Sequence, residues 1–228
     1  MALDPRYKAV GLDMDGTFMN TKIDYMKLGN VIFDELVEIG VPPSAIIRNR
    51  GSKAELESGI AWLKRNGMSD EAHTLNERIS KRSTSVEMEY CDVSRPFEGA
   101  TEAVKALKRE GYKVGILTRG GHSYAECILR KSNVLDLFDA IIARDDFPNE
   151  ESKPSPKAMV NLGNALGVKP EEILFLGDHE IDWLTARDSG AGFYGVLTGG
   201  FRLEDWRAAD ERISVIEGVA SLLKMMRD

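Results

Sequence analysis

The sequence predicts an α/β protein in which a doubly wound parallel sheet forms the core and an inserted α-helical domain forms a cap. Two observations predict this class. After residue 95, short apolar runs alternate with amphipathic helical segments, as in repeated βαβ units. Residues 17–95 instead have helical periodicity without clear strand runs. We therefore expect residues 1–16 and 96–228 to form the core, and residues 17–95 to form the cap.

The first predicted strand is the apolar run that ends at Leu12, directly before the sequence DMDGT. Three helical segments follow it, at residues 25–39, 53–66 and 69–86. They lie between the first strand and the next recognisable βα unit. This position is typical of an inserted helical module and not of a linker.

The remaining elements alternate regularly. The predicted helices cover residues 98–110, 123–131, 155–166 and 182–189, and the predicted strands cover residues 112–118, 138–143, 171–178 and 193–199. Ser155 and Pro156 suit the N-cap and first position of a helix, and residues 213–228 should form a short strand or turn followed by a helix. Right-handed crossovers then place helices on both faces of a Rossmann-like sheet.

Composition and charge exclude several classes of protein. Hydrophobic residues make up 43% of the 228 residues, which is enough for a core, and the net charge of −7 argues against a nucleic-acid or anionic-membrane binder. No apolar run approaches the length of a membrane span, and the first residues lack a signal-peptide pattern. Cys91 and Cys127 lack metal-ligand spacing, so we expect reduced thiols without a catalytic role. We expect a cytoplasmic protein, monomeric or weakly dimeric, with no nucleic-acid or membrane partner.

Polar residues collect where the predicted strands end. Ligands of an open parallel sheet bind beyond the carboxyl ends of its strands. The residues at those ends, or in the loops that follow them, are Asp13, Asp15, Thr118, Arg119, Lys153, Asp178 and Asp182. Chance supplies any one of these, but not all of them at the ends of different strands. The sequence therefore predicts one site at this edge.

The residue types at this edge suit phosphoryl transfer. In an extended chain Asp13 and Asp15 point to the same side, and Gly16 then allows a sharp turn. Clustered carboxylates and main-chain carbonyls are ligands of a hard cation such as Mg²⁺, which would relieve their repulsion. Thr118 and main-chain N–H groups can bind a phosphoryl group, and Lys153 can neutralise its charge.

Together these motifs closely resemble those of the haloacid dehalogenase superfamily. DMDGT resembles its first motif, the strand end at Thr118 its second, Lys153-Pro154 its third and GDHEID (residues 177–182) its fourth. The helical insert between the first and second motifs resembles the type 1 cap of the phosphoglycolate phosphatase and β-phosphoglucomutase branch. The resemblance spans essentially the whole chain.

The resemblance implies a role for each acid. Asp13 would be the nucleophile that forms an aspartyl-phosphate, and Asp15 the general acid and then the general base. Mg²⁺ would be held by Asp13, by the main-chain carbonyl of Asp15 and by Asp178, while Asp182 would hold a metal-bound water or orient Lys153. An acid at position 15 also argues against the dehalogenases and the ion-pumping ATPases of the superfamily, which lack one there.

The cap should determine substrate specificity. Residues 46–59 resemble the specificity loop of this cap type, in which Arg50 and Lys53 could bind a second anionic group of the substrate. The alternative is that both are solvated surface charges. His73, His122 and His179 show no metal-ligand pairing, so we expect none of them to be catalytic.

We therefore predict a Mg²⁺-dependent phosphatase acting on a small phosphorylated metabolite, with phosphoglycolate as the leading candidate. Four alternatives stay open. A β-phosphoglucomutase-like enzyme would use the same residues, and an inorganic pyrophosphatase is also possible. A phospho-acceptor signalling domain would share the acids, the threonine and the lysine, although such domains are about half this length and lack a cap. A catalytically idle homologue would usually have lost a motif residue.

Overall fold

The computed structural model describes residues 3–48 and 52–226, and the side chains of all of these except residues 52 and 53. The chain divides into two compact units. The first comprises Met1–Lys22 and Cys91–Asp228, and the second comprises Ile23–Tyr90. Each unit has its own hydrophobic core.

The first unit is built on a six-stranded parallel sheet with the strand order β5-β4-β1-β6-β7-β8. Its strands are β1 (Ala9–Leu12), β4 (Lys113–Leu117), β5 (Ala140–Ile142), β6 (Ile173–Gly177), β7 (Gly192–Val196) and β8 (Ser214–Ile216). All of these strands are joined by parallel pairing, which confirms the predicted α/β class. The chain adds β4 and β5 on one side of β1 and β6 to β8 on the other, so the order reverses at β1.

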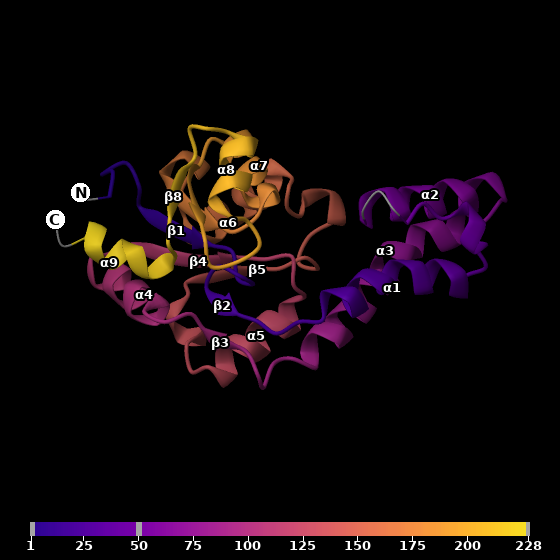
Figure 1. Cartoon of the computed structure of the whole chain (residues 1–228), viewed down its shortest axis with the longest axis horizontal. Coiled ribbons are helices and arrows are strands. Elements are labelled where there is room, and N and C mark those ends of the chain that lie inside the picture. The colour runs from indigo at the N-terminus through magenta and orange to yellow at the C-terminus, as the bar shows by residue number, and fades with distance from the viewer. Residues whose placement is uncertain (1–2, 49–51, 227–228) are drawn as a thin grey trace. The chain divides into compact units, whose positions relative to one another are not determined.

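Helices cover both faces of this sheet (Figure 1). The helices are α4 (Ala100–Arg109), α5 (His122–Lys131), α6 (Pro156–Leu166), α7 (Glu180–Ser189), α8 (Leu203–Ala209) and α9 (Leu222–Met225). Helices α6, α7 and α8 lie above the sheet in the view of Figure 1, and α4 and α5 lie below it. This division follows from right-handed crossovers that leave β1 in opposite directions.

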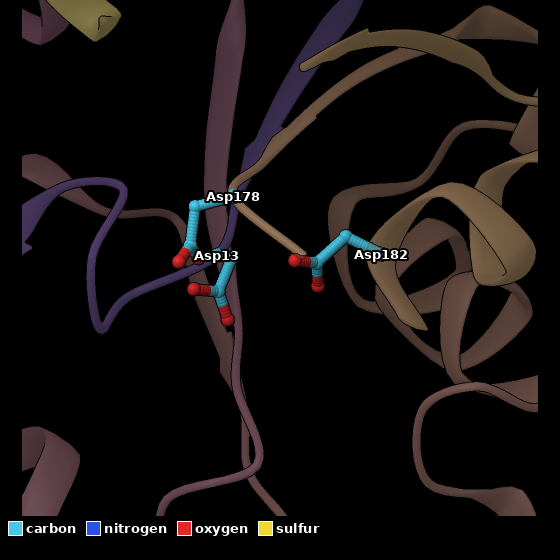
Figure 2. Close-up of side chains that lie close together, drawn as sticks. All are labelled: Asp13, Asp178 and Asp182. Atoms are coloured by element: carbon cyan, nitrogen blue, oxygen red, sulfur yellow. The ribbon is translucent and has the colours of Figure 1, made fainter. Parts of the chain in front are cut away.

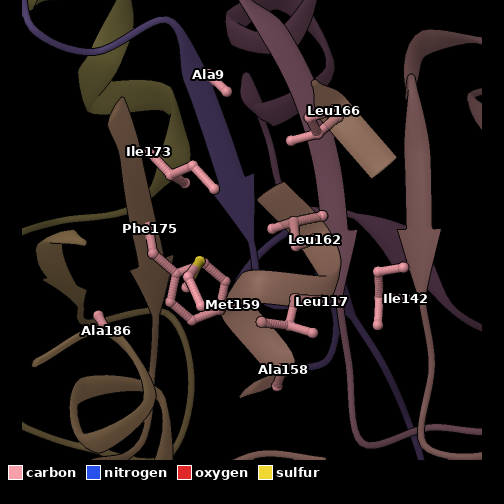
Figure 3. Close-up of a cluster of buried hydrophobic side chains, with 10 residues drawn as sticks. All are labelled: Ala9, Leu117, Ile142, Ala158, Met159, Leu162, Leu166, Ile173, Phe175 and Ala186. Carbon is pink, nitrogen blue, oxygen red and sulfur yellow. The ribbon is translucent and has the colours of Figure 1, made fainter. Parts of the chain in front are cut away.

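Helix α6 supplies much of the core on its side of the sheet. Ser155 is its N-cap and accepts a hydrogen bond from the Lys157 N–H, and Gly167 ends it in a left-handed conformation. Its apolar side packs on the strands, as Figure 3 shows. The buried cluster comprises Ala9, Leu117, Ile142, Ala158, Met159, Leu162, Leu166, Ile173, Phe175 and Ala186. This packing holds the strand ends in place.

The sequence did not predict three short elements. Strands β2 (Met19–Asn20) and β3 (Arg95–Pro96) form an antiparallel pair of two residues each, too short for a periodic signal. Helix α8 has only seven residues, three of them charged, but it buries Trp206 completely, and the Trp206 Nε1–H donates to the Val196 carbonyl at 3.2 Å.

The second unit contains the helices α1 (Tyr25–Glu38), α2 (Ser52–Arg65) and α3 (Ser69–Met88). They agree with the predicted helices to within two residues at each end. Asp24 caps α1 through hydrogen bonds from two main-chain N–H groups. The core of this unit includes Leu36, Val41, Ile46, Leu63, Ala72 and Leu75. Within the described residues of both units, no helix combines the length and apolar character needed to cross a membrane.

Glu35 ties α1 to α3 and is 5% exposed. Its carboxylate accepts hydrogen bonds from Arg78 Nε at 2.7 Å and from Arg82 Nη1 at 3.1 Å. Although burial alone raises the pKa of Glu35, the two guanidinium groups hold the pKa below its ordinary value of 4.5. The charged form therefore stabilises the unit above about pH 4.5, and this stabilisation is lost as the pH falls further.

Glu35→Gln should lower the free energy of unfolding of this unit by about 1–2 kcal/mol at neutral pH, since it removes hydrogen bonds between charged groups that are partly screened by solvent. It should also flatten the loss of stability at acidic pH. Native-state hydrogen exchange of α1 amides measures both effects. The control is Glu38→Gln, because Glu38 also binds Arg82 (2.7 Å) but its side chain is 53% exposed. Equal effects of the two substitutions would contradict the assignment.

Candidate active site

The strand register brings the predicted residues to one edge of the sheet. Leu12 of β1 lies beside Ile116 of β4 and Leu176 of β6. The residues that follow these strands therefore start from neighbouring positions, beyond the carboxyl ends and at the strand where the sheet order reverses. That is where an open α/β sheet binds its ligand.

The chain turns sharply after Asp13, as predicted. Gly16 has a φ of +81°, and its N–H donates to the Met19 carbonyl at 2.9 Å. A Cβ at Gly16 would lie 2.6 Å from Asp178 Oδ2, so only glycine permits this approach. The turn thus packs the first motif directly against the acid that follows β6.

Three buried acids converge here, as Figure 2 shows. Asp13, Asp178 and Asp182 each offer an oxygen atom, and these atoms lie within 4.8 Å of one another. The three residues are 7%, 9% and 1% exposed. Lys153, 2% exposed, donates hydrogen bonds to Asp13 Oδ1 at 2.5 Å and to Asp182 Oδ1 at 2.6 Å. One ammonium group is therefore bonded to two of the three carboxyl groups.

The charges in this cluster shift one another's proton affinities. Burial raises the pKa of Asp13 well above its ordinary value of 3.8; Lys153 opposes this rise, and the neighbouring carboxylates reinforce it. Burial likewise raises the pKa of Asp182. Burial disfavours the ammonium form of Lys153, yet Asp13 and Asp182 raise its pKa above the ordinary value of 10.5. Lys153 is therefore charged at neutral pH, and the acids lack a full counter-charge.

The donor set fits Mg²⁺. Carboxylate oxygens are the ligands that this hard cation prefers, and a divalent ion would supply the missing positive charge. Asp13, Asp178 and Asp182 can provide these oxygens directly or through bound water.

Other contacts, which the motifs of the sequence did not predict, position Asp178. The buried Thr17 hydroxyl donates to Asp178 Oδ1 at 3.2 Å, and the Gly200 N–H donates to Asp178 Oδ2 at 2.7 Å. Thr198 donates to the Gly16 carbonyl at 2.7 Å. Thr198 and Gly200 follow β7, so the strand-end rule, applied to β7 as well, would have found this loop.

Asp182 lies at the third position of α7, and His179 is the N-cap of this helix. Its Oδ2 accepts the His179 N–H at 3.1 Å, while Oδ1 binds Lys153. A Cβ at Gly177 would lie 2.3 Å from the Asp182 Cβ. The glycine before Asp178 therefore lets the first turn of α7 bring Asp182 up to the strand ends.

Arg119 connects two of the motif loops through its side chain. Its Nη1 donates to the Lys153 carbonyl at 3.0 Å, while Arg144 Nη1 donates to the Arg119 carbonyl at 2.6 Å. Thr118 is 2% exposed, and its hydroxyl oxygen accepts the Gly120 N–H at 2.9 Å. The loops carrying the second and third motifs are thus joined to each other.

A family model described as haloacid dehalogenase-like hydrolase matches residues 7–190. The chain belongs to the haloacid dehalogenase-like hydrolase family. This confirms the resemblance inferred from the motifs and makes the chain an enzyme of the hydrolase class, as predicted.

Curated relatives cover nearly the same length as this hydrolase. It is 25% identical to a phosphoglycolate phosphatase of Mannheimia succiniciproducens over 227 residues, which is 98% of this chain and 100% of the relative. It is 27% identical to a phosphoglycolate phosphatase of Cereibacter sphaeroides over 198 residues, or 85% and 86% of the two chains. A crystal structure of a hydrolase from Pseudomonas syringae has the same fold, with a TM-score of 0.65 at 22% identity, covering 96% of this chain and 98% of the other.

Three predicted site residues of the hydrolase remain, Asp15, Arg50 and Lys53, and the structure describes the side chain of Asp15 alone. The Tyr124 hydroxyl donates to Asp15 Oδ1 at 2.9 Å, so the Asp15 carboxyl group is bonded to α5. Arg50 and the side chain of Lys53 lie outside the described residues. Their role in substrate binding, like the assignment of Asp15 as a metal ligand through its carbonyl, stays a prediction.

Proposed function

We propose that this hydrolase is a Mg²⁺-dependent phosphatase that cleaves a small phosphomonoester through an aspartyl-phosphate on Asp13. The observation that carries the proposal is the buried Asp13 carboxyl group at a strand end, 2.5 Å from Lys153 and grouped with Asp178 and Asp182. The curated relatives named phosphoglycolate phosphatase make phosphoglycolate the leading candidate substrate. We place the enzyme in the cytoplasm, as a monomer or weak dimer.

The reaction would proceed in two steps, transfer of the phosphoryl group to Asp13 and hydrolysis of the aspartyl-phosphate. An Asp13 oxygen attacks phosphorus, the bond between phosphorus and the ester oxygen breaks, and Asp15 donates its proton to the departing oxygen. Asp15 then takes a proton from water as this water attacks phosphorus. The bond from phosphorus to Asp13 breaks, which releases phosphate and restores both acids. Bound Mg²⁺ would add positive charge beside the phosphoryl oxygens.

The other residues would stabilise charge on the transferring group. Lys153 would neutralise part of it, and Thr118 with the N–H groups of its loop would donate hydrogen bonds. Asp178 and Asp182 would hold the metal, directly or through water. Arg50 and Lys53 of the cap would bind a second anionic group of the substrate.

Phosphate release from a panel of small phosphate compounds tests this function. The panel contains phosphoglycolate, β-glucose 1-phosphate, pyrophosphate and p-nitrophenyl phosphate, each with Mg²⁺ and with EDTA. We expect release to be fastest with phosphoglycolate and to fall by roughly 100-fold or more in EDTA, since the acids then lack their counter-charge. Conversion of β-glucose 1-phosphate to an isomer without phosphate release would instead indicate a mutase. Release that persists undiminished in EDTA would contradict the metal dependence.

A further inference from the structure

A tyrosine of α5 reaches the proposed leaving-group acid. Tyr124 is completely buried, and its hydroxyl donates to Asp15 Oδ1 at 2.9 Å. We infer that Tyr124 is a positioning residue that holds the Asp15 carboxyl group in the orientation needed to protonate the leaving oxygen. This inference rests on the proposed function.

The ring of Tyr124 is itself held by the loop that carries the second motif. A Cβ built on Gly120 would lie 2.9 Å from Tyr124 Cδ1 and 3.2 Å from Cε1, so the ring packs closely on the main chain of Gly120. The N–H of the same glycine donates to Thr118 Oγ1 at 2.9 Å. The tyrosine therefore links the acid of the first motif to the proposed phosphoryl-binding loop of the second.

An aspartate needs such a contact because rotation about the bond to its carboxyl group is soft. In a protonated carboxyl group the carbonyl oxygen is the stronger acceptor, so the hydrogen bond from Tyr124 to Oδ1 would favour the proton on Oδ2. The hydrogen bond would thus select one orientation and one proton-bearing oxygen. Phenylalanine at this position would fill nearly the same space without the donor, so Tyr124→Phe removes this hydrogen bond alone.

The leaving group of the substrate provides a test that packing alone would not affect. p-Nitrophenolate leaves readily without a proton, whereas phenolate leaves poorly and gains more from an acid. We expect Tyr124→Phe to lower kcat/KM for phenyl phosphate by roughly tenfold, and for p-nitrophenyl phosphate by about twofold or less. The parameter kcat/KM is suitable because it reports the step in which the leaving group departs.

Two comparisons identify the cause. Tyr194→Phe removes a partly buried phenol from β7, away from the proposed catalytic residues, and should change neither rate. In an Asp15→Asn background, Tyr124→Phe should change the phenyl phosphate rate by less than about twofold, because a residue that acts through Asp15 has no effect without it.

The outcomes separate this inference from the proposed function. Equal losses on both esters, or an undiminished effect of Tyr124→Phe in the Asp15→Asn background, would overturn the inference alone. If the wild-type enzyme releases phosphate from neither ester and from no compound of the earlier panel with Mg²⁺ present, the proposed function fails and the inference falls with it. A selective loss on phenyl phosphate that needs Asp15 supports both.

Discussion

Asp13→Asn should lower kcat by roughly 10³-fold or more, because an amide cannot replace the carboxylate nucleophile. The fold should survive, since asparagine has nearly the same volume and Lys153 keeps its hydrogen bond to Asp182 at 2.6 Å. Phosphate release with the substrate preferred by the wild-type enzyme measures the loss.

The control for this substitution is Asp136→Asn, an exposed aspartate in the same unit. Both variants should show thermal unfolding close to that of the wild type, and only Asp13→Asn should be inactive. If Asp13→Asn retained turnover, Asp13 could not be the nucleophile and the mechanism would have to be abandoned.

Lys153→Met should affect both stability and activity. Asp13 and Asp182 would lose the ammonium group that lies between them, and breaking a buried ion pair in this way costs about 3–5 kcal/mol. Because the pKa of Lys153 is raised in the folded protein, its charge stabilises the fold fully at pH values below the ordinary pKa of 10.5. The full effect of the substitution is therefore expected at neutral pH. Activity should fall by roughly 100-fold or more, since the transferring phosphoryl group loses a positive partner.

Urea unfolding with and without Mg²⁺ measures the effect on stability. Added Mg²⁺ should restore part of the loss, because a second cation in the acid cluster compensates the same carboxylates. The control is Lys157→Met, which removes a lysine whose side chain is 66% exposed and binds Glu151 at 3.2 Å. Equal stabilities of the two variants would show that Lys153 does not stabilise the buried acids.

The elements that the sequence predicted well are those with strong local signals. Helix α6 begins and ends where Ser155, Pro156 and Gly167 place its caps, and the parallel strands carry continuous apolar runs. The strands β2 and β3 were not predicted because they pair residues that are far apart in the sequence, Met19 with Pro96 and Asn20 with Arg95. Helix α8 was not predicted because a single residue, Trp206, makes its buried contact with the core, which leaves no helical periodicity to detect.

In the candidate site, too, some residues could be predicted from the sequence and others could not. Asp13, Thr118 and Asp178 could be predicted because parallel strands end at a common edge, so their order along the chain gives their place. The contribution of Tyr124 could not be predicted, since a tyrosine within a helix otherwise indicates ordinary core packing. Its contact with Asp15 depends on how α5 packs on the sheet, which no local pattern encodes. The choice of substrate depends on cap residues, and no sequence rule like that of the strand ends predicts which of them contact it.

The most direct test of the mechanism is to trap the phosphorylated enzyme. The enzyme is mixed with substrate and Mg²⁺, quenched in acid and treated with borohydride, which reduces an aspartyl-phosphate to homoserine. Peptide mass spectrometry then identifies the modified residue. We predict homoserine at position 13, only when both substrate and Mg²⁺ are present, and none in Asp13→Asn. Active turnover with an unmodified Asp13, or with homoserine at another aspartate, would contradict the central claim.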